Sequence, residues 1–325
     1  PAGMFYNSGL TAVTIGPDVK EINEFAFTDT LVETFTVVSG NTTFKAQTAN
    51  YVLSADGKTL EAVSPLLTGA FTADTIGVNT ITKIGRGAFS HNLKITSISL
   101  PDVTYVGAYA FGYYDETQPN TRSSVASVTL GKLTYIGEYA FYGTQITEMP
   151  NFDANTVVER YAFGKSSVAS VVIPDGMNVP DGMFAECMFL TSVTLGNDVT
   201  VGEFAFITNR NHNLRAMQVT IGNKTGYKYV FASSIVKVEI GNNVVLGKGA
   251  FQNAASLRSV TLGENAEIGE QAFYNCEGLT SVTIGENIQN LGLTTSGLRN
   301  ERLGIDASAF ENCINLETVT VAEGG

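Results

Sequence analysis

Few residues of this sequence have the types and spacing that catalysis requires. The 325-residue chain contains only two histidines, His91 and His212, which are far apart in the sequence. The chain therefore lacks three imidazole ligands for a zinc ion. No Gly-x-Ser-x-Gly elbow is present that would set up a Ser-His-Asp triad. We expect no enzyme activity, no bound metal and no cofactor.

The three cysteines occupy one repeated position. Each follows a phenylalanine by three residues: Cys187 after Phe184, Cys276 after Phe273 and Cys313 after Phe310. A thiol suits such a small buried position in a turn. Cys276 and Cys313 belong to consecutive copies and could approach disulfide distance, although stacking brings equivalent residues close whether or not they bond. Cys187 has no such neighbour, so the cysteines do not form a disulfide framework.

Hydroxyl side chains dominate the main candidate binding surface. Segments such as Ser259-Val-Thr261-Leu alternate polar and apolar residues, as a strand with one buried face does. Two interpretations of the outward hydroxyls stay open: a hydrogen-bonding platform for a ligand, or a cross-strand ladder that merely suits an exposed strand. The candidates are Gln218, Thr220, Lys237, Glu239, Ser259, Thr261, Ser281 and Thr283, with Gln218 and Thr220 expected beside the charged pair of Lys237 and Glu239.

Exposed tyrosines are the second candidate set. Tyr113 and Tyr114 stand in one insertion, and Tyr227 and Tyr229 lie near an irregular repeat. Tyrosine gives rigid amphipathic contact area, as interface hot spots do. The alternative is that these rings cover an edge of the core.

The elements that position these residues are copies of one unit. Successive phenylalanines are most often 22 residues apart, as from Phe89 to Phe111, which lies within the range of leucine-rich repeats. Ala-Phe pairs end at Phe27, Phe89, Phe111, Phe141, Phe163, Phe206, Phe251, Phe273 and Phe310, and weaker versions end at Phe5, Phe184 and Phe231.

Each copy has two halves. The first is a strand of the form Leu-x-x-Val-x-Ile, as in Leu279 to Ile284, and a Gly or Pro then turns the chain. The second reads Ile-Gly-x-x-Ala-Phe, as in Ile136 to Phe141, and predicts an irregular or 3₁₀-like return because it lacks strand alternation. We predict one repeat solenoid over residues 1–325 with about 12–13 repeats, a parallel β-sheet on its concave face and the returns on its convex face.

Four segments interrupt the period. Residues 41–64 predict a β-hairpin, closed by an Asp56-Gly57 turn, that projects from the edge of the solenoid. Shorter loop insertions are expected near 113–124, 208–213 and 289–304.

The repeat unit also carries a family resemblance. The stretch from Ile268 through Ala272-Phe273, Cys276 and Leu279 to Ile284 resembles the BspA-type leucine-rich repeats of surface proteins from oral and gut bacteria and some parasitic protists. The resemblance covers essentially the whole chain and implies a non-enzymatic, cell-surface or secreted adhesion module whose partner is a host protein, a matrix component, a glycan or another cell. The alternative is a spacer or appendage domain of a larger surface protein, including a glycan-binding or enzyme-associated one.

Composition narrows the partners further. The net charge is -12 and no run of Lys and Arg occurs, which argues against a nucleic-acid ligand. No apolar run approaches the 18 residues of a membrane span. The first five residues resemble the middle of a repeat, so we expect the chain to be a fragment of a longer protein.

Overall fold

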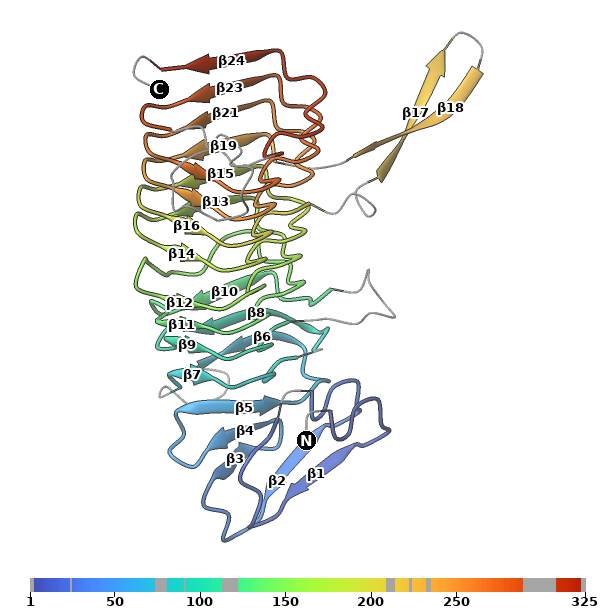
Figure 1. The fold of residues 1–325 in the computed structure, drawn as a ribbon. Helices are drawn as coiled ribbons and strands as arrows, with labels where there is room; N and C mark the ends of the chain where they lie inside the picture. Colours follow the sequence, from blue (N-terminus) through green and yellow to red (C-terminus); the bar gives the residue numbers. More distant parts are fainter. Residues whose placement is uncertain are drawn as a thin grey trace, which may run out of the picture. The chain divides into compact units, whose positions relative to one another are not determined.

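The computed structural model describes residues 3–23, 25–73, 81–90, 92–112, 122–208, 214–221, 224–231, 235–288 and 308–322, with the backbone alone in 214–221 and 224–231. The chain forms two compact units, residues 1–167 and 168–325, here named the N-terminal and the C-terminal unit. Both consist mainly of stacked turns with short parallel strands (Figure 1). The predicted fold class, a leucine-rich-repeat solenoid, is confirmed. That the two units make one continuous domain stays a prediction.

The described residues of the N-terminal unit form three sheets. The first pairs β1 (Ala12–Ile15) with β2 (Thr34–Val37). The second has the order β10 (Ser127–Leu130), β8 (Ile95–Leu100), β6 (Gly69–Thr72). The third has the order β12 (Val157–Val158), β11 (Tyr135–Ile136), β9 (Tyr105–Val106), β7 (Lys83–Ile84), β5 (Thr59–Val63), β4 (Tyr51–Ser54), β3 (Phe44–Thr48).

In the part of the C-terminal unit that the structure describes, the strands also form three sheets. The longest has the order β13 (Ser170–Ile173), β15 (Ser192–Leu195), β19 (Lys237–Ile240), β21 (Ser259–Leu262), β23 (Ser281–Ile284), β24 (Thr318–Val321). A second has the order β14 (Asn178–Val179), β16 (Thr200–Val201), β20 (Val245–Leu246), β22 (Glu267–Ile268). The third is an antiparallel hairpin of β17 (Leu214–Ile221) and β18 (Lys224–Phe231).

The return half of each turn is more regular than the sequence predicts. Its first residues form a two-residue strand, so that Tyr135–Ile136 pairs in parallel with Tyr105–Val106 on one side and Val157–Val158 on the other. The described residues contain no 3₁₀ helix. Turns stacked in register bring each N–H opposite a carbonyl of its neighbour, so even two extended residues can pair.

Phenylalanine rings form the core of each unit, as the 22-residue period predicts. In the C-terminal unit Phe184, Phe206, Phe251, Phe273 and Phe310 stack with centroids 4.9 to 5.5 Å apart. The N–H of the first four of these residues donates to the Ala carbonyl of the next turn, as Phe251 does to Ala272 at 2.8 Å. Burying each ring stabilises the stack by about 1.5–3 kcal/mol.

The hairpin predicted within 41–64 is present but does not project. Strands β4 and β5 are antiparallel, and Gly57 in the connecting turn has a φ of 77°, a conformation that glycine adopts without strain. However, β5 continues the solenoid sheet, because Leu60 pairs in parallel with Ile84. Val52, Leu53 and Leu60 are fully buried. The hairpin is therefore part of a turn, and the predicted projection is wrong.

The repeat predicted at Phe231 is also wrong. Phe231 pairs with Leu214 in the hairpin, and the ring that stacks on Phe206 is Phe251. Strand β15 accordingly pairs with β19, and equivalent residues of the two turns lie 45 positions apart. The insertion is therefore longer than the predicted loop 208–213. Alternation in 214–221 is the same for a solenoid strand and a hairpin strand, so sequence alone does not identify its partner.

Candidate functional site

The predicted outward hydroxyls lie on the six-stranded sheet of the C-terminal unit. Its register aligns equivalent residues of successive turns, and none of the aligned outward side chains is buried. This confirms the outward direction of Ser259, Thr261, Ser281 and Thr283. We name as the hydroxyl ladder the rows Ser170, Ser192, Lys237, Ser259, Ser281, Thr318 and Val172, Thr194, Glu239, Thr261, Thr283, Thr320.

The charged position in this ladder is neutralised internally. Lys237 Nζ lies 2.6 Å from Glu239 Oε1, and Thr194 Oγ1 donates a hydrogen bond of 3.0 Å to Glu239 Oε2. The bond from Lys237 and then that from Thr194 lower the pKa of the exposed Glu239 carboxyl. Val172 interrupts the same row with a side chain that is 71% exposed. The ladder is thus a nearly neutral surface of hydroxyls with one ion pair.

Other predicted site residues lie elsewhere. Gln218 and Thr220 belong to β17, whose described partner is β18, so their expected position beside Lys237 and Glu239 is wrong. The sheet neighbours of Glu239 are Thr194 and Thr261 instead. Tyr227 and Tyr229 are in β18. Tyr113, Tyr114, His91 and His212 lie outside the described residues.

The N-terminal unit carries an aromatic surface that sequence analysis missed. Tyr105 stacks on Tyr135 with centroids 4.6 Å apart, and Tyr139 stacks on both Tyr109 and Tyr161 at 5.0 and 5.1 Å. All five side chains are half-buried, and we name them the tyrosine surface. The sequence does contain a pattern that indicates this surface, because Tyr109, Tyr139 and Tyr161 each stand two residues before the repeat phenylalanine.

Three of these tyrosines have an unusual backbone conformation. Tyr109, Tyr139 and Tyr161 have φ values of 55°, 54° and 55°, in the left-handed region that bulky residues avoid. Gly87 and Gly249 occupy the same position in other turns, with φ of 63° and 60°. The fold therefore does not need an aromatic ring here.

Charged groups border the tyrosine surface. Arg160 Nε lies 2.7 Å from Glu138 Oε1, and Lys83 Nζ lies 5.5 Å from the centre of the Tyr105 ring. Burial, followed by the Glu159 charge, raises the pKa of Tyr135. Burial, followed by Tyr109, raises the pKa of Tyr139. The phenols of Tyr135 and Tyr139 therefore stay neutral hydrogen-bonding groups at physiological pH.

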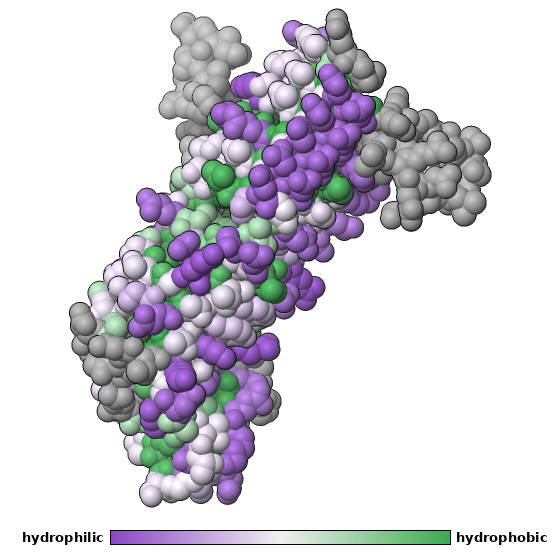
Figure 2. Space-filling view, turned by 90° about the vertical axis from the view of Figure 1, so that its left-hand side faces the viewer, coloured by the Kyte–Doolittle hydropathy of each residue, from purple (hydrophilic) through white to green (hydrophobic). Residues whose placement is uncertain are grey.

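Amide side chains line the corners of the C-terminal unit. Asn265 donates to Asn243, and Asn243 to Asp198, at 2.9 and 2.8 Å. A second amide row links Asn312, Asn275 and Asn253 with bonds of 3.0 Å. The side of the unit where the ladder strands end carries a hydrophilic band (Figure 2). Among the described residues no three or more His, Cys, Asp or Glu side chains gather as metal ligands.

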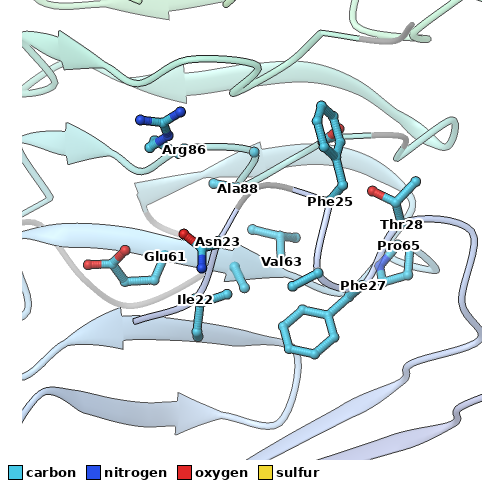
Figure 3. A pocket seen from close by; sticks show the side chains of 14 residues that line it. Ile22, Asn23, Phe25, Phe27, Thr28, Glu61, Val63, Pro65, Arg86 and Ala88 are labelled. Atoms are coloured by element: carbon cyan, nitrogen blue, oxygen red, sulfur yellow. The ribbon is translucent and has the colours of Figure 1, made fainter. Parts of the chain in front are cut away.

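A small cavity lies between turns of the N-terminal unit. The Glu61 carboxylate stands at one end and the Phe25 and Phe27 rings at the other (Figure 3). Burial, followed by the Asp56 charge, raises the pKa of Glu61. The cavity volume of about 20 Å³ holds about one water molecule. It is too small to bind an organic ligand.

Three solved structures resemble the chain. A leucine rich cell surface protein from Faecalibacterium prausnitzii A2-165 is 19% identical, with 98% of this chain and 80% of that chain covered and a TM-score of 0.43. A leucine-rich repeat protein from Eubacterium ventriosum ATCC 27560 is 18% identical, with coverages of 91% and 64% and a TM-score of 0.39. One from Bacteroides ovatus ATCC 8483 is 16% identical, with coverages of 86% and 74% and a TM-score of 0.38. None of the curated proteins matches the chain.

In the described residues, no helix has the length and apolar character to cross a bilayer.

A family model identifies the repeats themselves. The model of the BspA type leucine rich repeat region matches in 6 copies, over residues 1–55, 73–167, 119–237 and 180–295. These matches span well over half of the chain and include stacked phenylalanines of both units, from Phe89 to Phe163 and from Phe184 to Phe273. The chain belongs to the BspA-type leucine-rich-repeat family.

Proposed function

We propose that this chain is a non-enzymatic binding module of a bacterial cell-surface or secreted protein, and that its ligand is an extracellular protein. The tyrosine surface of the N-terminal unit is the observation that carries this proposal. Family membership supports the surface location, and extended repeat surfaces commonly bind macromolecules.

The backbone of the tyrosine surface supports a binding role. A left-handed conformation costs a bulky residue about 1–2 kcal/mol, whereas Gly87 and Gly249 adopt it freely in other turns. Ring stacking returns about 0.5–1.5 kcal/mol for each pair. Stability alone therefore gives little reason to keep three tyrosines at this position. Contact with a ligand supplies a reason.

The geometry of the rings favours a protein over a sugar. A sugar that stacks on an aromatic residue needs an open ring face, but Tyr139 is covered on both faces by Tyr109 and Tyr161. The stack instead presents the edges of its half-buried rings. Rigid tyrosines together with arginines such as Arg160 are typical of protein-binding hot spots.

An array of matrix proteins, containing collagens, laminin, fibronectin and fibrinogen, tests the proposal. We expect at least one to bind the wild-type chain and to bind the variant Tyr109→Gly/Tyr139→Gly/Tyr161→Gly at least about tenfold more weakly. The control is Gln271→Gly, which changes the same backbone position, φ 57°, in the C-terminal unit. Equal binding by the tyrosine variant, with an unchanged circular dichroism spectrum, contradicts the proposal. Silence of the whole array favours a spacer role.

The hydroxyl ladder is a second candidate surface, for a glycan. Thr194, Glu239 and Lys237 already form a hydrogen-bonded group, and sugar hydroxyls can join such a network. Glycan-array binding that is lost in Ser259→Ala/Thr261→Val/Ser281→Ala/Thr283→Val, but not in the tyrosine variant, would assign a glycan to the ladder. Equal glycan binding by the ladder variant and the tyrosine variant would argue against a glycan site on the hydroxyl ladder.

A further inference from the structure

Two cysteines of the C-terminal unit lie at one position of neighbouring turns. The turns are in register on both sides of the thiols, because Phe273 donates to the Ala309 carbonyl at 2.8 Å and Asn275 to the Glu311 carbonyl at 3.0 Å. The rings of Phe273 and Phe310 stack at 5.2 Å. Equivalent α-carbons of turns paired in this way are about 5 Å apart, inside the span that a disulfide bridges.

The thiols are free and touch one another. The Cys276 and Cys313 side chains are hydrogen-bonded together, and neither forms a disulfide. Each Sγ also contacts a phenylalanine carbonyl of the preceding turn, Phe251 for Cys276 at 3.4 Å and Phe273 for Cys313 at 3.3 Å. Both thiols thus donate toward the turn that precedes their own.

We propose that Cys276 and Cys313 are an oxidation site, where a small disulfide oxidant converts the two thiols into a covalent link between the last two described turns. Cys187 occupies the same position after its phenylalanine but has no cysteine in a neighbouring turn. It serves as an internal control.

The reaction is a thiol–disulfide exchange in two steps. Contact with Cys276 lowers the pKa of Cys313, whereas burial raises that of Cys276, so Cys313 supplies the first thiolate. It attacks one sulfur of the oxidant and releases one small thiol. Cys276 then gives up its proton and attacks the Cys313 sulfur, which releases the second small thiol. One protein disulfide forms and one small disulfide is reduced.

The link would fasten the least covered turn of the described C-terminal unit. All four residues of β24 are exposed, and the Ile314 side chain is 74% exposed. The two cysteines are 37 residues apart, against 22 for the equivalent pair in neighbouring turns. A longer enclosed loop makes a disulfide more effective at restricting the unfolded chain.

Thiol counting and peptide mapping test the proposal. The full chain is incubated with oxidised glutathione, unfolded, alkylated and digested with trypsin. We expect free thiols to fall from three, the number in the sequence, to one, and the peptides 259–299 and 303–325 to be joined. Cleavage of the last turn by thermolysin should slow at least about tenfold, and dithiothreitol should reverse the effect.

Two variants control the assignment. Cys187→Ser should keep the joined peptides, whereas Cys313→Ser should keep two free thiols and give no joined pair. Three free thiols in the oxidised wild type, glutathione attached to Cys313 without a link, or a link through Cys187 would each overturn the proposal.

Discussion

The two units meet the same backbone demand with different chemistry. Every turn needs residues in the left-handed conformation where the chain bends around the phenylalanine core. The N-terminal unit places stacked rings at one such corner, Tyr109, Tyr139 and Tyr161. The C-terminal unit has Gly182, Phe204, Gly249, Gln271 and Ser308 at the same corner, and no tyrosine among them. At another corner it places the linked amides of Asn253, Asn275 and Asn312.

This difference separates what the fold requires from what it permits. Asparagine adopts positive φ with little strain, and its amide bonds to the next turn, so the amide rows stabilise the stack. Tyrosine is strained at such a corner, and its ring stacks on the rings of the neighbouring turns. The phenylalanine core is common to both units, whereas the corners are the part that can be adapted to a ligand.

The largest expected effect tests the shared core. Phe141→Ala in the N-terminal unit and Phe251→Ala in the C-terminal unit should each lower the free energy of unfolding by about 3–5 kcal/mol, because both rings are fully buried. Urea unfolding followed by circular dichroism measures this. Phe189→Ala, at a 48% exposed ring, is the control and should change little. Unequal losses in the two units would break the claim of a common core.

The second-largest effect is expected from larger side chains placed between the turns. Ala140 and Ala272 are fully buried, and their carbonyls accept bonds from Phe111 and Phe251. A larger side chain would force neighbouring backbones apart, so Ala140→Leu and Ala272→Leu should each cost about 3 kcal/mol. The same urea titration measures the loss. Wild-type stability in either variant would show that the turns pack less tightly than described.

The amide row should contribute a smaller amount. Asn275 is 5% exposed, has a φ of 59° and bonds to Asn253 and Asn312. Asn275→Ala should cost about 2 kcal/mol, from lost hydrogen bonds and backbone strain. Asn275→Gly removes only the bonds and should cost about 1 kcal/mol. If both variants have the melting temperature of the wild type, the amide row does not stabilise the fold.

The tyrosine corner should respond differently. In Tyr139→Gly the relief of backbone strain offsets the lost stacking, so we expect the free energy of unfolding to change by less than about 1 kcal/mol. Chemical denaturation beside Asn275→Gly gives the comparison. A loss above about 2 kcal/mol would assign the rings to stability and weaken the case for a ligand.

The smallest effects depend on pH and have opposite signs in the two units. Burial raises the pKa of Glu61 above its ordinary value, so its contribution to stability is fully present below the unfolded pKa and is lost as pH rises through the folded pKa. The pKa of Glu239 is lowered by Lys237 and Thr194, so its contribution is present above the unfolded pKa and is lost as pH falls through the folded pKa.

Melting temperatures at pH 7 and pH 4 test these signs. Glu61→Gln should melt above wild type at pH 7 and close to it at pH 4. Glu239→Gln should melt slightly below wild type at pH 7, because an exposed ion pair contributes little. The reverse order at pH 7 would contradict both assignments.

The sequence predicted the parts of the fold that repeat, but it did not predict which strands pair where the repeat is irregular. The 22-residue period located the buried rings, and the Ser-Val-Thr alternation identified the outward residues of β21 and β23. Pairing across 214–231 was misjudged because a strand pattern does not specify whether its neighbour is a stacked turn or the other arm of a hairpin. Leu60 was assigned to a projecting hairpin because its pairing with Ile84 depends on the register of an irregular turn.

The candidate site was predicted less well for a related reason. Ser259 and Thr261 follow from a strand period, but the tyrosine surface depends on the backbone conformation at a corner. Tyr105 and Tyr109 stand in different parts of one repeat, and only stacking shows that each continues into the next turn. Comparing corner residues between copies would have found Tyr109, Tyr139 and Tyr161.

The bonds from each phenylalanine N–H to the alanine carbonyl of the next turn have a mechanical consequence. They are directed from turn to turn, so a pull on one end of a unit loads the outermost turn first and peels it away before the next. Each lost turn of 22 residues would lengthen the chain by about 75 Å. Under flow, such a unit would yield turn by turn, in larger steps where equivalent residues are 37 or 45 positions apart, and would dissipate work while its remaining turns keep their surface.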